Sequence, residues 1–269
     1  MTTWVLLRGL TRESRHWGRF PETFEQIIAA ADPEGVRLVP IELPGNGSAN
    51  TAQSPAHVAE FVAWVRAALV ARQIEPPYRV IAMSLGGMVA TAWAQRAPEE
   101  IERLVLINTS MRPFCDLPQR LRPSAWPRLA LAIAAWRSPS TCERMIHALT
   151  CRARDAASDD IEAWVTIRRD APVSALNGLR QLLAAARFEA ARAAPRCPTL
   201  ILSSARDRLV NPVCSARIAS HWGTDHLEHA WAGHDLPHDD PVWTAESVRN
   251  WLRWLDRSAS ADRTHEAAA

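Results

Sequence analysis

The sequence contains no lysine, because all 31 of its basic residues are arginines. A chain without lysine cannot use a P-loop lysine, a Schiff base with pyridoxal phosphate or any other covalent catalysis by a lysine amine. The charges are almost balanced, since 31 basic and 29 acidic residues leave a net charge of +2. So small an excess gives no electrostatic reason to expect a nucleic-acid partner.

Cysteines and long apolar runs are also scarce. The five cysteines are an odd number, and no two of them have CxxC spacing. We therefore expect neither a disulfide framework nor a zinc ribbon, and a reducing cytoplasm fits best. No run approaches the ~20 apolar residues of a membrane helix, so no membrane span is expected. The first apolar run, Trp4 to Leu7, is too short for a signal peptide.

The sequence instead has a large apolar fraction arranged in an alternating pattern. Hydrophobic residues make up 48% and charged residues 22% of the chain, which suits one sizeable globular domain. Short apolar runs alternate with segments whose apolar residues recur at helical spacing. The runs that indicate strands are 4–7, 36–41, 78–83, 104–107, 199–202 and 225–230. This pattern predicts an α/β fold, with a mostly parallel sheet of about six strands flanked by helices.

The alternation stops between residues 111 and 190, where the sequence indicates helices alone. We therefore expect a core made of residues 1–110 and 191–257, with residues 111–190 inserted as a helical cap. Residues 258–269 are small and polar and are expected to form a flexible tail. The cap lies between two strands, so it must leave from and return to the carboxyl edge of the sheet. Ligands of open α/β sheets bind at this edge, and the cap is therefore placed to act as a lid.

One serine follows a predicted strand directly and precedes a helix, in the run AMSLGG at residues 82–87. A sharp strand-to-helix turn raises such a serine above the sheet and exposes its hydroxyl. We expect Ala82 and Gly86 to face each other across this turn, which requires both to be small. The alternative is that Ser84 merely caps an ordinary helix, but the strand-to-helix context favours a nucleophile.

A serine hydroxyl is a poor nucleophile unless a base accepts its proton. His234 and His238 lie in a loop just after the last predicted strand, level with Ser84 at the carboxyl edge. We favour His234 as the base, because Gly233 before it gives the backbone freedom to turn the ring inward. His238 is expected to be a solvated loop residue.

The base needs a carboxylate that orients it, and Asp207 follows the predicted strand at 199–202. Taken alone, Asp207 is better explained by a surface ion pair with Arg206 or Arg208. The chain order of Ser84, Asp207 and His234, each in a loop after a strand, favours a catalytic role.

An acyl-transfer site also needs donors for the oxyanion. One is expected to be the backbone N–H of Leu85, the residue after the nucleophile. The other is expected to be the N–H of Leu10 in the loop after the first strand, where Gly9 allows a close approach of the chain. Backbone donors leave no side-chain signature, so this assignment depends on position.

Five motifs carry a resemblance to a known family: LLRGL at 6–10, ELPGNG at 42–47, AMSLGG at 82–87, ARDRLV at 205–210 and AGHDLPHDDP at 232–241. Over residues 3–257 the chain resembles the α/β-hydrolase superfamily, and within it small bacterial serine carboxylesterases such as the biotin-pathway methyl ester esterase. The resemblance assigns the nucleophile, acid and base to Ser84, Asp207 and His234, and the oxyanion donors to Leu10 and Leu85.

Two positions depart from the pattern of this family. Arg8 stands where the family usually has histidine, and Ala82 replaces the first glycine of the serine motif. Neither change removes an atom to which a catalytic role is assigned.

These residues predict a serine hydrolase that cleaves carboxylic esters of short to medium acyl chain through an acyl-enzyme, with no cofactor and no metal. The same triad also serves thioester hydrolysis, lactone opening and acyl transfer, and a non-catalytic ligand-binding protein is the alternative from another class.

The predicted cap contains a helix near residues 126–136 that is apolar on nearly all sides, so we expect it to be covered on every face. We expect Trp126, Trp136 and Trp164 to line the substrate pocket. The alternative is that they form the cap's own core.

Overall fold

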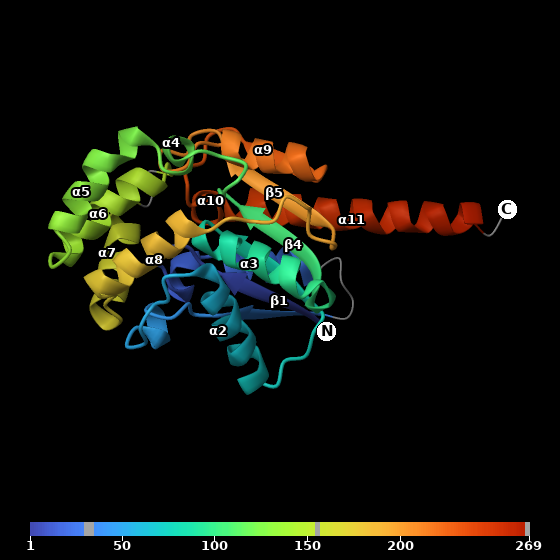
Figure 1. Cartoon of the computed structure of the whole chain (residues 1–269), viewed down its shortest axis with the longest axis horizontal. Coiled ribbons are helices and arrows are strands. Elements are labelled where there is room, and N and C mark those ends of the chain that lie inside the picture. Colours follow the sequence, from blue (N-terminus) through green and yellow to red (C-terminus); the bar gives the residue numbers. More distant parts are fainter. Residues whose placement is uncertain (30–34, 154–156, 267–269) are drawn as a thin grey trace.

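The computed structural model describes residues 1–29, 35–153 and 157–266, and within them it shows a six-stranded sheet (Figure 1). The strands lie in the order β2-β1-β3-β4-β5-β6, and each neighbouring pair is parallel. They are β1 (Thr2–Leu7), β2 (Val36–Pro40), β3 (Tyr78–Met83), β4 (Ile101–Ile107), β5 (Thr199–Ser204) and β6 (Asp225–His229). The predicted sheet is confirmed, and each predicted strand overlaps an observed one.

Helices cover both faces of this sheet, and the alternation of side chains along β1 shows why. Val5 and Leu7 point into one buried cluster, while Trp4 and Leu6 point into the other. The first cluster includes residues of α2 (Val58–Ala71), α3 (Leu85–Arg96) and α9 (Val213–Trp222). The second includes residues of α1 (Phe20–Ala29) and α11 (Pro241–Glu266).

Between β4 and β5 the described residues form five α-helices and one 3-10 turn (Pro123–Ala125), which together we call the insertion. The α-helices are α4 (Leu117–Arg120), α5 (Trp126–Ala134), α6 (Pro139–Thr150), α7 (Ala157–Asp170) and α8 (Ala175–Arg187). In Figure 1 the insertion lies at one end of the molecule, beyond the arrowhead of β1, while α11 extends in the opposite direction. The insertion therefore stands at the carboxyl edge of the sheet.

Three local expectations differ from the structure. Apolar residues recur at helical spacing between residues 13 and 31 and predict one helix there. In the structure this helix is interrupted at Gly18, whose φ of 56° separates a 3-10 turn (Ser14–Trp17) from α1; residues 30 and 31 lie outside the described part. Where a tail was expected from residue 258, α11 continues to Glu266, and residues 267–269 lie outside the described part.

Among the described residues, none of the helices has the length and apolar character of a membrane span.

The third difference concerns α5, which the sequence predicts to be covered on every face. Trp126, Leu131 and Ile133 are instead 49%, 57% and 62% exposed, and Ala132 is buried. The prediction was wrong because α5 lies on the outside of the insertion and has a packing partner on one side (Figure 1).

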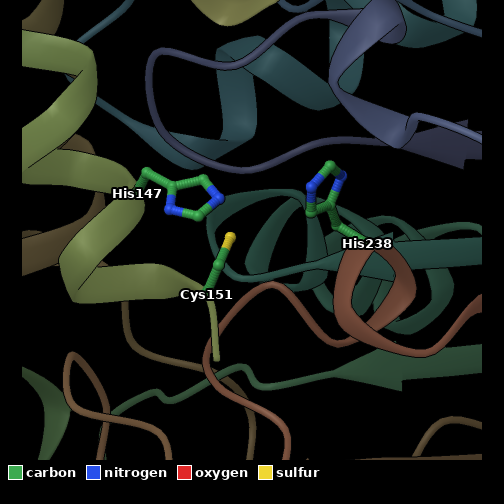
Figure 2. A group of neighbouring side chains, drawn as sticks. All are labelled: His147, Cys151 and His238. Carbon is green, nitrogen blue, oxygen red and sulfur yellow. The ribbon is translucent and has the colours of Figure 1, made fainter. Parts of the chain in front are cut away.

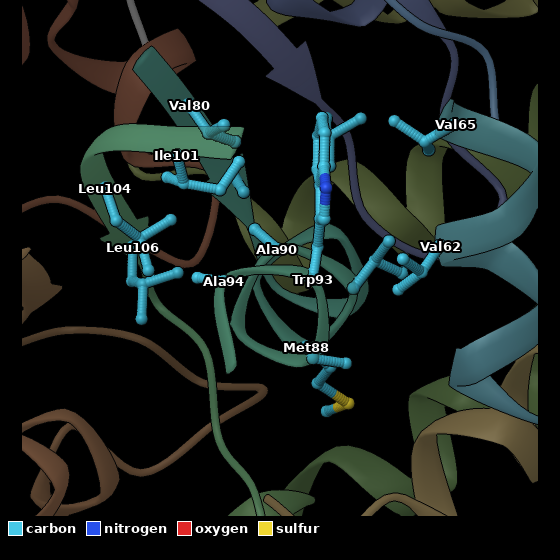
Figure 3. Packing of buried hydrophobic residues seen from close by; sticks show 14 of the residues in the cluster. Val62, Val65, Val80, Met88, Ala90, Trp93, Ala94, Ile101, Leu104 and Leu106 are labelled. Carbon is cyan, nitrogen blue, oxygen red and sulfur yellow. The ribbon is translucent and has the colours of Figure 1, made fainter. Parts of the chain in front are cut away.

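Trp93 gives a direct test of the first cluster. It is fully buried and packs among the side chains around Val65 and Val80 (Figure 3), and its indole N–H donates to Glu100 Oε2 at 2.6 Å. We expect Trp93→Ala to lower the free energy of unfolding by about 3–5 kcal/mol, because it opens a large cavity. Urea denaturation measures this loss. The control Trp254→Ala, at a side chain that is 48% exposed, should change it by less than about 0.5 kcal/mol; equal losses would contradict this account of the core.

Candidate active site

Ser84 occupies a strained turn between β3 and α3. Its φ of 54° and ψ of −117° lie in a region that side-chain-bearing residues rarely adopt. Ser84 lies between the last residue of β3 and the first residue of α3, which is the strand-to-helix position that the sequence indicates. Thr109 Oγ1 donates to the Ser84 carbonyl at 2.8 Å and so fixes the turn from the end of β4.

The glycine two residues after Ser84 is needed for a different reason from the one expected. A Cβ on Gly86 would lie 2.5 Å from the Leu7 carbonyl oxygen and 2.6 Å from that of Arg8. Gly86 therefore faces the end of β1, and Ala82 is not among its nearest neighbours. The small residue lets α3 begin directly against the loop after β1.

The loop after β1 also lies against the serine side chain. A Cβ on Gly9 would be 3.1 Å from the Cβ of Ser84 and 3.6 Å from its hydroxyl oxygen. Gly9 thus permits the close approach that the sequence analysis expected. Leu10 follows Gly9 in the same turn, and Leu85 follows Ser84 as the first residue of α3.

Asp207 and His234 form a buried hydrogen-bonded pair. His234 Nδ1 lies 2.7 Å from Asp207 Oδ2, and the two side chains are 4% and 1% exposed. The other carboxylate oxygen accepts the backbone N–H groups of Leu209 and Val210, at 2.7 and 2.9 Å. Both oxygens of Asp207 therefore have donors inside the protein, and an ion pair of this carboxylate with Arg206 or Arg208 is not formed. The geometry orients the His234 ring and leaves its Nε2 atom for another partner.

The loop that carries His234 is fixed from two sides. Asn108, just after β4, donates through Nδ2 to the His234 carbonyl at 2.8 Å. On the other side, the Thr150 carbonyl of the insertion accepts the Asp235 N–H at 2.9 Å. Gly233 packs so closely on this carbonyl that a Cβ would clash with it. Gly233 is therefore needed for this close packing, and its φ lies outside the left-handed region.

His238 is not the solvated loop residue that the sequence suggested. Its side chain is 10% exposed, its Nε2 lies 3.1 Å from Asp160 Oδ2, and its ring packs on Trp164 with a centroid separation of 5.3 Å. The prediction was wrong because α7 folds over this loop, which one sequence motif could not reveal.

Arg8, which stands in place of the family's usual histidine, ties the serine turn to the histidine loop. Its guanidinium donates to both carboxylate oxygens of Asp235, at 2.9 and 2.6 Å, and to Met83 Sδ at 3.3 Å. It also lies over the Trp17 ring at 4.8 Å. Burial raises the pKa of Asp235, but the charge and hydrogen bonds of Arg8, together with the charges of His238 and Arg12, lower that pKa overall. The buried Arg8 guanidinium thus contacts both Met83, which precedes Ser84, and Asp235, which follows His234.

Polar contacts also attach the insertion to the loop after β1. Gln181 of α8, which is fully buried, accepts the Thr11 N–H at 2.7 Å. Arg12 donates to Glu143 of α6 at 2.7 Å, and Arg168 of α7 donates to the other oxygen of Glu143 at 3.0 Å. The side chains of these contacts, Gln181, Arg12, Glu143 and Arg168, were not predicted, since isolated polar residues carry no pattern that marks them as buried.

The three tryptophans expected to line a pocket have different environments. Trp164 is 2% exposed, and its ring lies under the Arg12 guanidinium at 4.4 Å and beside His238. Trp136 donates to the Val173 carbonyl at 3.0 Å within the insertion. Trp126 is half exposed and donates to the Leu121 carbonyl. Of the three, Trp164 has contacts with the core close to the histidine loop.

The buried pair of Arg8 and Asp235 can be tested by replacing one or both partners. Arg8→Met should lower the free energy of unfolding by about 3–5 kcal/mol, because it leaves a buried carboxylate without its counter-ion. The double variant Arg8→Met/Asp235→Leu should recover most of this loss, and thermal and urea denaturation measure both. Arg66→Met, at the half-exposed pair with Glu100, is the control and should cost less than about 1 kcal/mol. A double variant as unstable as the single one would contradict this account.

Comparisons with known proteins agree with this architecture. Residues 4–247 match the model of the family described as Alpha/beta hydrolase family. The pimeloyl-[acyl-carrier protein] methyl ester esterase of Chromobacterium violaceum is 31% identical over 212 residues, which are 75% of each chain. The protein of the same name from Aromatoleum aromaticum is 29% identical over 222 residues, 79% of this chain and 82% of that protein.

Among solved structures, an esterase from Thermogutta terrifontis is similar with a TM-score of 0.70 and 19% identity, over 95% of this chain and 90% of that one. At this identity the likeness concerns the fold. The parallel sheet, the serine turn and the family match over most of the chain lead to one conclusion: the chain belongs to the alpha/beta hydrolase family.

Proposed function

We propose that this protein hydrolyses carboxylic esters, with Ser84 as nucleophile, His234 as general base and Asp207 as the acid that orients it. The observation that carries the proposal is the buried contact of 2.7 Å between His234 Nδ1 and Asp207 Oδ2, at the sheet edge where Ser84 occupies a turn with positive φ. The names of the two relatives, both methyl ester esterases, support an ester as the substrate.

The reaction proceeds in two steps through an acyl-enzyme. His234 Nε2 accepts the hydroxyl proton of Ser84 while Oγ attacks the ester carbonyl, and the resulting imidazolium gives this proton to the leaving alcohol. Water then attacks the acyl-enzyme with His234 as base, and Ser84 regains its proton as the acid leaves. Asp207 stabilises the imidazolium in both steps, and its two backbone donors hold the carboxylate in place.

The oxyanion of each tetrahedral intermediate is proposed to bind the backbone N–H groups of Leu10 and Leu85. Leu85 begins α3, so its N–H belongs to the positive end of a helix dipole. Leu10 follows Gly9, whose close contact with the Ser84 side chain supports this position for the second donor. Preorganised donors of this kind contribute about 3–4 kcal/mol each to the stabilisation of the transition state.

The substrate is proposed to be an ester of a small alcohol with a short to medium acyl chain, and the insertion is proposed to be a cap over the site. The contacts of α6, α7 and α8 with the loops after β1 and β6 support this position for the cap. Trp164, together with Trp136 and Trp126, is proposed to line the acyl pocket, since small-ligand sites are mostly apolar.

Replacement of the nucleophile or the base tests the proposed chemistry. Ser84→Ala and His234→Ala should each lower kcat for a p-nitrophenyl ester by about 10³-fold or more, because each removes an atom that reacts. His221→Ala is the matched control, since His221 is an exposed histidine at the end of α9, and it should keep kcat within about twofold. Circular dichroism checks that every variant is folded. Near wild-type turnover in folded Ser84→Ala would show that the assignment is wrong.

The chain-length profile tests the proposed cap. With p-nitrophenyl esters from acetate to palmitate, we expect the highest kcat/KM for short to medium chains, because an apolar pocket closed by the cap has a limited length. Trp164→Ala should shift the optimum toward longer chains by opening that pocket, with smaller shifts for Trp136→Ala and Trp126→Ala. Trp254→Ala, on α11, should leave the profile unchanged. A best rate with palmitate, or an unchanged profile in all three folded cap variants, would contradict the proposal.

A further inference from the structure

Two histidines and a cysteine gather at the contact between the insertion and the core, and none of them belongs to the proposed triad. They are His147, Cys151 and His238, and one potential ligand atom of each lies within 4.8 Å of the others. The sulfur of Cys151 points toward the space between the two imidazole rings (Figure 2). These residue types are the usual protein ligands of zinc.

The local structure explains why two of these side chains share one side of a helix. His147 lies in the last turn of α6 and Cys151 follows its end, four residues later, with the Cys151 N–H donating to the His147 carbonyl at 2.8 Å. Residues spaced by four lie above one another on a helix. His238 approaches from α10 (Leu236–Asp239), so the group joins the insertion to the loop that carries His234.

Asp160 supplies a fourth potential ligand from α7. Its Oδ2 atom lies 3.1 Å from His238 Nε2 and 3.7 Å from His147 Nε2. Four ligand atoms around a tetrahedral zinc ion are about 3.3–3.8 Å apart, given bonds of about 2.0–2.3 Å. The distances from Asp160 to the two histidines are close to this range. The other three ligand atoms lie up to 4.8 Å apart, and Asp160 is outside that group of three, so zinc binding requires a contraction of about 1 Å or more.

One polar atom among these side chains is buried without a hydrogen-bond partner. It is His147 Nε2, which has no such partner among the described residues; the His147 side chain is 7% exposed. A buried polar atom without a partner costs free energy, and a bound metal ion is one way to satisfy it. The Trp164 ring covers the group, with centroids 5.1 Å from His147 and 5.3 Å from His238, which limits access of water.

We propose that His147, Cys151, His238 and Asp160 bind one Zn²⁺ ion that fastens the insertion to the histidine loop. Two imidazoles, one thiolate and one carboxylate suit zinc better than calcium or magnesium, which prefer oxygen ligands. With four protein ligands the ion has no open position, so it is structural, and the ester chemistry uses no bond to it. The Cys151 thiol loses its proton to solvent as the Zn–S bond forms.

Zinc and cobalt binding to the purified full-length chain, after treatment with a chelator and desalting, tests the site. We expect one equivalent of Zn²⁺ to bind with a dissociation constant below about 1 µM in competition with a chromophoric chelator. Co²⁺ should give the intense absorption of a thiolate ligand and of tetrahedral geometry. Zn²⁺ should raise the Tm by about 5 °C.

Three variants distinguish loss of zinc binding from loss of folding. Cys151→Ser should weaken zinc binding by about 100-fold or more and remove the thiolate absorption. Cys142→Ser is the matched control, because Cys142 is also a buried free cysteine on α6 but lies outside the group, and it should bind zinc like the wild type. Asp160→Asn is a second variant at a partly exposed side chain and should weaken binding without loss of folding.

Either of two results with the wild-type protein would overturn the proposal. One is zinc binding weaker than about 10 µM, and the other is Co²⁺ binding without thiolate absorption. Equal loss of binding in Cys142→Ser and Cys151→Ser would show that the effect is general. None of these measurements uses ester turnover, so the outcome is independent of the proposed function.

Discussion

The turn at Ser84 is the constraint on which the rest of the site depends. Its positive φ brings the start of α3 against the carbonyl oxygens at the end of β1, a packing that only a glycine at position 86 allows. The loop after β1 is then held beside the serine side chain, where Gly9 leaves room for it. From this loop Arg8 reaches Asp235 and so fixes the residue after His234. One strained turn thus sets the positions of two loops that come from distant parts of the sequence.

The insertion is attached to this arrangement mainly by polar groups that are buried. Gln181, Glu143 and Asp160 come from three different helices, and each contacts the loop after β1 or the loop after β6. Such contacts are directional, so they fix the orientation of the helices more strictly than apolar packing alone. The apolar side chains of α5 contribute less to this attachment, because several of them face solvent. The proposed zinc ion would add a further tie of the same directional kind between the insertion and the core.

Much of the fold and the local parts of the site could be predicted from the sequence. Strand-to-helix alternation determines the parallel sheet, and the segments around Ser84, Asp207 and His234 each follow a strand, so their common edge could be inferred. The contacts between distant segments could not be inferred. The partner of Arg8 lies 227 positions away, and neither residue belongs to a pattern that reveals the pair. The exposure of α5 and the burial of His238 were missed for the same reason, since both depend on how the insertion folds over the core.

Covalent labelling with a fluorophosphonate tests the central claim most directly, because it reports an activated serine without knowledge of the substrate. The reagent phosphonylates a serine whose hydroxyl is deprotonated by a neighbouring base. Intact-mass and peptide mapping of the wild-type protein at pH 8 should show one added phosphonyl group, on Ser84, and His234→Ala should label far more slowly. No label on the folded wild-type protein, or a label on another serine, would contradict the account and favour a ligand-binding protein built on this fold.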